Sequence, residues 1–444
     1  MPAVNRQTEG DLLAIFRAAV PSDFFRDLRK ASGKRAEGGV YTVELTTWMI
    51  MRQRLDGKGT QSTAVQEVAE GRPQALLRSH KRLAEQTLSS NTGAYSRAYR
   101  RLGQGVAEQV AHRIFNYLMA DVLEALPGLG RRVFLLDGSS VDLQATPELC
   151  KAYPPAQNQH GSTHWPVLRI VVAHDLVSGM AMQPCWGPMY GDQPVSEQEL
   201  AAAGIGQLPA GSVVVADRNF GVFSTAYDAD RRGYPVLLRL TDVRARYLLQ
   251  GKLPQQTDQC VDWKPSRWDR NNHADLPAEA CVRGRVIACQ VSHKDRTFQL
   301  YFFTTLELTP KLMAQLYGYR WNIETDLRSL KHTLHLQSLA ARSVDSVSKE
   351  LVLAVAAYNL VRGAMLAAAR LAGIDPRQLS FSRVQDVVNA CLPNLTAAAS
   401  PQDYQRVLDR MLRRAAQCKL PHRPQRPSYP RAVWPRPRSY PKHQ

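Results

Sequence analysis

Four residues between positions 317 and 331 combine an acid, two cations and a hydroxyl at a spacing that suits a helix. The segment reads YGYRWNIETDLRSLK and carries Tyr317, Arg320, Glu324 and Lys331. A helical residue turns the chain by about 100°, so the other three side chains would lie within about 40° of Glu324 on one face. A carboxylate on that face can hold a divalent metal ion while the cations bind phosphate oxygens. This is the chemistry that cuts a nucleic-acid backbone.

An ordinary surface helix offers an alternative explanation of the same four residues. Arg and Glu four positions apart, as at Arg320 and Glu324, are common on exposed helices. Such pairs stabilise a helix by only a few tenths of a kcal/mol and need no function. The spacing alone therefore leaves both interpretations open.

Two aspartates follow apolar stretches of strand type. Asp137 comes after VFLL and Asp217 after VVVA, so each is predicted at or near the end of a buried strand, directly before a turn. An isolated buried carboxylate is costly, so the strand must present it to a cleft, a cation or a metal. Aspartate is also a common turn residue, and for either position alone that interpretation is the better one.

The three acids are more informative together. If the sheet brings Asp137 and Asp217 to one edge, the helical segment can cover that edge with Glu324. Three carboxylates in one cleft repel one another unless cations lie between them. Two Mg²⁺ ions about 4 Å apart, or Mn²⁺ in their place, would relieve the repulsion and carry out in-line phosphoryl transfer. Oxygen ligands suit these ions better than zinc.

The overall composition indicates a polyanionic partner. The 444 residues carry a formal net charge of +18 and a pI of about 9.8, which favours nucleic acid. We expect no membrane span, because no apolar run is long enough, and no signal peptide, because the first residues lack its pattern. The seven cysteines are scattered without a C-x-x-C pair, which favours reduced thiols in a cytoplasmic protein over a zinc site.

Residues 1–130 are predicted to form a helical domain, because apolar residues recur there at three- to four-residue spacing. Residues 72–101 hold seven Lys or Arg against one acid, Glu85. A helical domain with such a face is a candidate DNA-docking module. A solvated helical surface has the same composition, so that alternative also stays open.

The rest of the chain divides into segments that differ in composition and in the spacing of their apolar residues. Strands that then alternate with helices predict a mixed α/β sheet covered by helices over 131–240 and 307–370. Residues 241–306 are predicted as a β-rich insertion in which the stretch KPSRWDRNNHADLP is a loop, and residues 371–418 as a helical region for oligomerisation. The tail, 419–444, has seven Pro and seven Lys or Arg without an acid, so it is expected to bind DNA phosphates or aid solubility rather than pack.

At its chemical residues the chain resembles the DDE transposases of bacterial insertion sequences. Asp137 in LLDGSS and Asp217 in VVADRNFG are similar to the family's first two acids. The spacing Y-x2-R-x3-E-x6-K matches the Tyr-Arg-Glu-Lys signature of the insertion-sequence-four group. The resemblance covers residues 130–370 well, and the helical N-terminal part and the basic tail are also similar to that group.

The resemblance implies a fold and a set of site residues. The fold would be α/β, with a ribonuclease-H-like catalytic core, a β-rich insertion and a preceding helical DNA-binding domain. The catalytic and metal-binding residues would be Asp137, Asp217 and Glu324, with two Mg²⁺ ions, or Mn²⁺, per active site. The residues implied to contact the DNA backbone beside the cut are Tyr317, Arg320 and Lys331.

The resemblance also implies an activity. The protein would bind the terminal inverted repeats of an insertion sequence, cleave these ends and join the 3′-OH to target DNA. It would work in the bacterial cytoplasm at the nucleoid, as a homo-oligomer, most simply a dimer in the DNA complex. Two alternatives are a ribonuclease-H-like nuclease without strand transfer and a catalytically silent DNA-binding protein derived from a transposase.

Some members of the family free the element through a hairpin on its ends, with an aromatic residue of the insertion stacked on a flipped base. The sequence does not single out that residue here. The aromatic candidates are Trp263, Trp268, Phe298 and Tyr301. The tentative DNA contacts are Arg97, Arg100, Arg101, Trp268 and Tyr301.

Overall fold

A mixed sheet forms the centre of one half of the molecule. The computed structural model describes residues 9–31, 39–56, 59–120, 122, 129–158, 161–273, 275–293, 296–337 and 339–421. Within these residues, nine strands join in one sheet. They are β1 (Val133–Asp142), β2 (Pro155–Asn158), β3 (Gly161–Asp175), β4 (Cys185–Pro188), β5 (Val213–Ala216), β6 (Val236–Arg239), β7 (Thr257–Trp263), β8 (Val282–His293) and β9 (Arg296–Thr304).

The strand order is β2-β3-β1-β5-β6-β9-β8-β7, with β4 paired to β3. Strands β1, β5 and β6 run parallel, and the other pairings are antiparallel. The sequence VVVA of β5 is buried along its whole length, as expected of a central parallel strand covered on both faces. Strand β1 is buried from Val133 to Leu136 and becomes half-buried from Asp137, where it leaves the core.

Seven helices and one wider helical turn surround the described part of the sheet. They are α8 (Pro147–Ala152), α9 (Glu197–Ile205), α10 (Phe223–Arg231), α11 (Asp242–Leu248), α12 (Arg267–Asn272), α13 (Pro310–Gly318), α14 (Trp321–Arg328) and the π-helical turn η2 (Ser329–Thr333). Helix α9 packs on β3 and β4, α10 on β6, and α14 on β1. A capping box between Ser196 and Glu199 fixes the start of α9.

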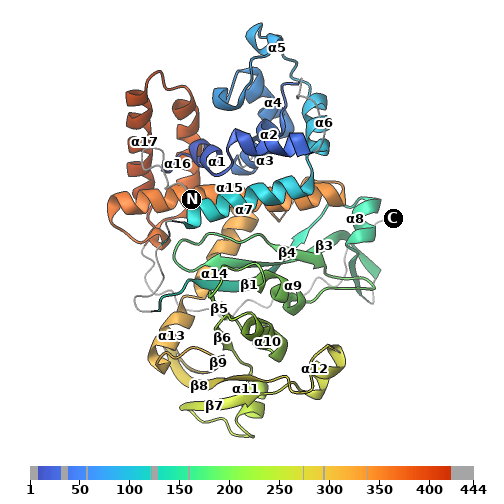
Figure 1. Ribbon diagram of the computed structural model, residues 1–444, viewed down its shortest axis with the longest axis vertical. Coiled ribbons are helices and arrows are strands. Elements are labelled where there is room, and N and C mark those ends of the chain that lie inside the picture. The colour runs from blue at the N-terminus through green and yellow to red at the C-terminus, as the bar shows by residue number, and fades with distance from the viewer. Residues whose placement is uncertain are drawn as a thin grey trace.

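The remaining helices belong to a part of the molecule built around the long helix α15, with α7 running alongside it (Figure 1). The N-terminal ones are α1 (Leu12–Ala19), α2 (Ser22–Ala31), α3 (Val43–Leu55), α4 (Gln61–Ala69), the 3₁₀ turn η1 (Gln74–Leu76), α5 (Lys81–Ala84), α6 (Gly93–Arg101) and α7 (Gln104–Met119). The C-terminal ones are α15 (Val344–Ala372), the 3₁₀ turn η3 (Pro376–Gln378), α16 (Phe381–Thr396) and α17 (Pro401–Ala416). The predicted helical character of the first 130 residues thus holds for the described ones.

Helix α15 is the core on which the two halves meet. It packs against α3, α7, α16 and α17, and Gly373 ends it in the left-handed conformation, with φ 63°. By length and composition α15 could span a membrane, but its apolar window is entirely buried by the rest of the chain. Its hydrophobicity is therefore that of a core helix.

Two sequence-based expectations need correction. The DGSS segment is no turn, because β1 continues to Asp142 while the long strand β3 supplies antiparallel partners as far as Val167. Segment 241–306 contains the helices α11 and α12, and a capping box between Ser266 and Asp269 starts the second inside the expected loop. Its strands also extend the main sheet, since β9 pairs with β6. The expectations for the tail concern residues that, beyond 421, lie outside the described ones.

Candidate active site

Asp137 and Asp217 occupy equivalent places on neighbouring parallel strands. The register pairs Leu136 of β1 with Ala216 of β5, so the next residue on each strand is the aspartate. Paired strands lie about 4.8 Å apart, which places the two carboxylates at the same edge of the sheet. The Asp217 carboxylate accepts a hydrogen bond from the backbone N–H of Asn219, 2.8 Å away, and this bond shapes the loop that leaves the strand.

The pKa of Asp137 is raised above the ordinary value of an aspartate. Burial raises its pKa to about 6, and the nearby charges of Asp217 and Glu197 add to the rise. The backbone N–H of Gly138, 2.8 Å from Oδ1, and the guanidinium of Arg320 act in the opposite direction. The charged form of Asp137 is therefore disfavoured here, first by burial and then by the neighbouring acids.

The segment that carries the other predicted residues is not one helix, and this corrects the prediction of a continuous helical face. Helix α13 ends at Gly318, and a tight turn with three-residue hydrogen bonds, Arg320 N–H to the carbonyl of Tyr317 and Ile323 N–H to that of Arg320, leads into α14. After Arg328 the chain widens into η2, in which the N–H of Leu334 reaches the carbonyl of Ser329.

Arg320 joins the strand acid to the helix acid. It directly precedes the first residue of α14 and is 8% exposed. One of its terminal nitrogens lies 3.7 Å from the Asp137 carboxylate, and the other donates to Glu324 across 3.0 Å. The width of a guanidinium then keeps these two carboxylates at most about 9 Å apart. The Glu324 side chain is 44% exposed, so it faces the open side of the cleft.

Lys331 reaches the same strand from the π-helical turn. Its Nζ donates to the hydroxyl of Ser139 across 3.1 Å. Side chains two residues apart on a strand share a face, so Asp137 and Ser139 both point toward the segment that covers β1. The structure therefore brings four predicted residues, Asp137, Arg320, Glu324 and Lys331, to one face of one strand.

Two polar atoms of the same segment lack partners. The hydroxyl of Tyr317 and the Nε of Arg320 are buried without a hydrogen bond of ordinary geometry. The guanidinium groups of Arg239 and Arg320 lie near the Tyr317 hydroxyl, whose pKa is raised by burial. Buried donors of this kind normally find a partner, so the pair could serve an incoming oxygen ligand.

Glu197 is a fourth carboxylate at this edge that sequence reasoning missed. It is the first residue of α9, and its carboxylate accepts a hydrogen bond from the Asn219 amide, two residues past Asp217. A Cβ placed on Gly138 would lie 2.5 Å from the Glu197 carboxyl carbon, so only glycine lets the acid approach β1 so closely. The capping motif predicts where α9 begins, but nothing in the sequence predicts that its first turn lies beside Asp137.

The acids suit a hard divalent cation, although they are not yet gathered around one. Among the described residues, no three Asp, Glu, His or Cys side chains already form a set that could hold an ion. Arg320 accounts for this, because its guanidinium stands between Asp137 and Glu324. Carboxylate oxygens, among them those of the partly exposed Glu324, nevertheless fit Mg²⁺ or Mn²⁺.

Comparison with known proteins agrees with this geometry. The family model of the transposase DDE domain matches residues 128–360, which span β1 to α15 and include all three acids. The chain belongs to the transposase DDE domain family. It is also 29% identical, over 321 residues, to the transposase InsG for insertion sequence element IS4 of Escherichia coli (strain K12), and the match covers 70% of each chain. The IS4-type DDE transposase suggested by the Tyr-Arg-Glu-Lys spacing is thereby confirmed.

DDE transposases act on DNA and use divalent metals. A residue that contacts DNA must be accessible, so the exposure of each tentative DNA contact of this transposase is relevant. Arg97, Arg100 and Arg101 are exposed on α6, whose buried face carries Tyr95 and Tyr99. Trp268 is 66% exposed on α12 and Phe298 is 47% exposed on β9.

Two other aromatic candidates of the insertion are buried, and this corrects the suggestion that Tyr301 contacts DNA. Tyr301 is 4% exposed, and its hydroxyl donates to the carbonyl of Pro254. Trp263 is equally buried, with its ring against Phe303. Neither can stack on a base in this conformation, because alternation along β7 and β9 turns both rings into the core.

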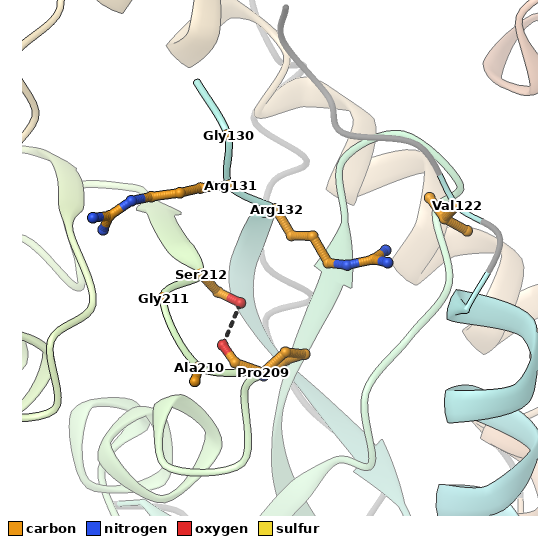
Figure 2. A pocket seen from close by; sticks show the side chains of 8 residues that line it. All are labelled: Val122, Gly130, Arg131, Arg132, Pro209, Ala210, Gly211 and Ser212. Carbon is orange, nitrogen blue, oxygen red and sulfur yellow. Dashed lines mark hydrogen bonds between the residues drawn. The ribbon is translucent and has the colours of Figure 1, made fainter. Parts of the chain in front are cut away.

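A cavity of about 790 Å³ lies at the opposite end of the central strands (Figure 2). It is lined by Val122, Gly130, Arg131, Arg132, Pro209, Ala210, Gly211 and Ser212. These residues include the segments that lead into β1 and β5, whereas Asp137 and Asp217 stand where the parallel register of the two strands ends. The cavity is therefore separate from the acid cluster of this transposase.

Proposed function

We propose that this transposase binds the terminal inverted repeats of its insertion sequence, cuts them and joins the 3′-OH to target DNA at the cleft of Asp137, Asp217 and Glu324. The sheet supports a ribonuclease-H-like core. Strands β4, β3 and β1 are antiparallel neighbours, β1, β5 and β6 are parallel ones, and α9 and α10 follow β4 and β5. That order puts the two aspartates on adjacent central strands.

The acids would hold the metal ions. When bound, two Mg²⁺ or Mn²⁺ ions supply an activated attacking oxygen and a stabilised leaving oxygen for in-line phosphoryl transfer. Asp137 and Asp217 offer their carboxylates from the rigid sheet, and Glu324 closes the set from α14. For Glu324 to do so, Arg320 must release it, and a DNA phosphate is the natural competitor for that guanidinium.

The cationic residues would hold the DNA strand beside the cut. The unpaired Nε of Arg320 and the hydroxyl of Tyr317 can both donate to phosphate oxygens, and Lys331 can exchange Ser139 for a phosphate. The exposed arginines of α6 would bind the element ends farther from the cut. Trp268, exposed on the insertion, is the better placed aromatic for a flipped base if the reaction passes through a hairpin.

The single observation that carries the proposal is the bridge made by Arg320. One buried guanidinium contacts the strand acid Asp137 and the helix acid Glu324, which lie far apart in sequence. An Arg–Glu pair on an ordinary surface helix would not be expected to contact a half-buried aspartate of the central sheet. We also propose that the protein pairs two DNA ends as a dimer in the bacterial cytoplasm, with the α16–α17 region contributing to oligomerisation.

The test uses purified full-length protein and linear DNA that carries the inverted repeats flanking its gene. With Mg²⁺, the wild type should nick the ends at the element boundary and join them to a plasmid target. Glu324→Gln should bind the ends as the wild type does and cut nothing, since it removes a ligand charge and keeps the shape. Binding without any cleavage by the wild type would identify a silent DNA-binding protein, and cleavage without joining would identify a nuclease.

A further inference from the structure

Helix α14 carries a second acid that points away from the cleft. Asp326 lies two residues after Glu324, so the helix turns it to the opposite face. Glu324 is exposed, whereas Asp326 is fully buried. A buried carboxylate is costly unless several donors satisfy it, so its surroundings need an explanation that the proposed cutting chemistry does not give.

Two arginines from different elements grip the Asp326 carboxylate. Arg377, in η3, donates to both oxygens across 2.7 Å. Arg362, in the middle of α15, makes a further ion pair with it and also donates to the hydroxyl of Tyr358. Charge-assisted bonds from two arginines on different elements fix the direction of a carboxylate as well as its position. Through Asp326, α14 is therefore ion-paired with both η3 and α15.

The same arginines tie the cluster to the turn between β3 and β4. Arg377 donates to the carbonyls of Asp175 and Leu176 across 2.7 and 2.9 Å. Gly179 has a φ of 74°, and a Cβ there would lie 2.7 Å from Arg377 and 2.8 Å from Arg362. The turn thus closes over both guanidinium groups only because this residue is glycine. Asp326 is consequently connected to the strand that neighbours β1.

We propose that Asp326 is a positioning residue that fixes the rotation and depth of α14, and so sets where Glu324 and Lys331 stand relative to Asp137. The inference rests on the proposed function for its catalytic consequence. On the cleft side, polar contacts with β1 are made by Arg320 and Lys331, and both side chains are expected to exchange partners when DNA binds. The buried cluster on the opposite face is then the fixed reference for the catalytic glutamate.

The experiment compares full-length Asp326→Asn with Asp11→Asn. Asp11 is also a buried carboxylate, bound to Tyr404 and the N-terminus of α1, but it lies far from the cleft in the helical half. Hydrogen–deuterium exchange by mass spectrometry reports the order of α14 without any need for activity. End binding and cleavage are measured in parallel. Arg377→Lys is the second variant, because it keeps the charge but cannot bind the Asp326 carboxylate and the carbonyls of Asp175 and Leu176 in the way that three guanidinium nitrogens do.

Asp326→Asn should speed exchange in residues 319–333 and leave β1 and α15 protected. It should bind DNA ends within about twofold of the wild type and cleave them about 100-fold more slowly, since a displacement near 1 Å costs that much. Asp11→Asn should show neither local effect. If Asp326→Asn does not fold, Arg377→Lys decides by the same readouts with a smaller loss.

Unchanged exchange in 319–333 with cleavage near the wild-type rate would overturn the proposal. Exchange raised evenly along the whole chain, with binding and cleavage lost together, would also overturn it, because that is the result of a merely structural residue. If the wild type itself does not cut DNA, the proposed function fails. The exchange measurement then still decides whether Asp326 positions α14.

Discussion

Replacing Asp137 by Asn should make the metal-free protein more stable, although it removes a catalytic acid. Burial raises the pKa of Asp137 to about 6, above its ordinary value of 3.8. The unfolded chain therefore ionises this group more readily than the folded one. Above pH 6 the folded state carries a charge that disfavours folding, and below pH 4 the group is protonated in both states. Asparagine resembles the protonated acid at every pH.

The size of the effect follows from the difference between the two pKa values. Each unit is worth about 1.4 kcal/mol, so the gain for Asp137→Asn approaches about 3 kcal/mol at pH 7.5 and falls below about 1 kcal/mol at pH 4. The side chain is 21% exposed, so solvent screening brings the value at pH 7.5 nearer to about 2 kcal/mol. Asp142→Asn, at an exposed position of the same strand, should change stability little at either pH.

Chemical unfolding in EDTA at pH 7.5 and pH 4 measures the difference directly. Addition of millimolar Mn²⁺ at pH 7.5 should stabilise the wild type and not Asp137→Asn, so the gap between them narrows or reverses. Equal stabilities at pH 7.5, or a loss of stability in Asp137→Asn at both pH values, would refute the argument that Asp137 is held in an unfavourable charged state. A matching gain in Asp142→Asn would refute it as well.

Three further perturbations probe the same region. Lys331→Ala should lower the slope of log affinity against log salt for end binding by about one, because one phosphate contact is lost; an unchanged slope would make it a lysine that binds only Ser139. Gly138→Ala should slow cleavage more than it weakens end binding, because the new Cβ displaces Glu197; full activity in a cleavage assay would show that this approach does not matter. Burial lowers the pKa of His174 to about 4, so the stability that it contributes is present above pH 6.5 and is lost as the pH falls toward 4. The wild type should lose about 2 kcal/mol more than His174→Gln between pH 7.5 and 5 in thermal melts, and parallel losses would contradict this.

The three acids could be predicted from their residue types and spacing, and the central strands from their apolar runs. VFLL before Asp137 and VVVA before Asp217 mark buried strands, and in a parallel pair the next residues fall side by side. The break between α13 and α14 could not be predicted, because the apolar spacing continues across it. At the break Arg320 lies 3.7 Å from Asp137, a tertiary contact that the spacing does not reveal.

Other features depend wholly on long-range packing. Glu197 and Asp326 are two acids among 39, and neither lies in a pattern that marks it. Their roles appear when α9 is seen against Gly138 and when η3 brings Arg377 beneath α14. Tyr301 was misjudged for the related reason that a strand pattern does not say which face of an extended sheet will be covered.

The central claim is that Asp137, Asp217 and Glu324 hold the same metal ions, and anomalous diffraction from Mn²⁺ tests it most directly. Crystals of the full-length protein with a DNA end and Mn²⁺ should give anomalous peaks at the carboxyl edge of β1 and β5. The Mn²⁺ ions at these peaks should be bound by Asp137 and Asp217. Glu324 should have left Arg320 and should bind an ion at the same place. The account would be contradicted if peaks appeared only at other sites. It would also be contradicted if both aspartates held Mn²⁺ while Glu324 still bound Arg320.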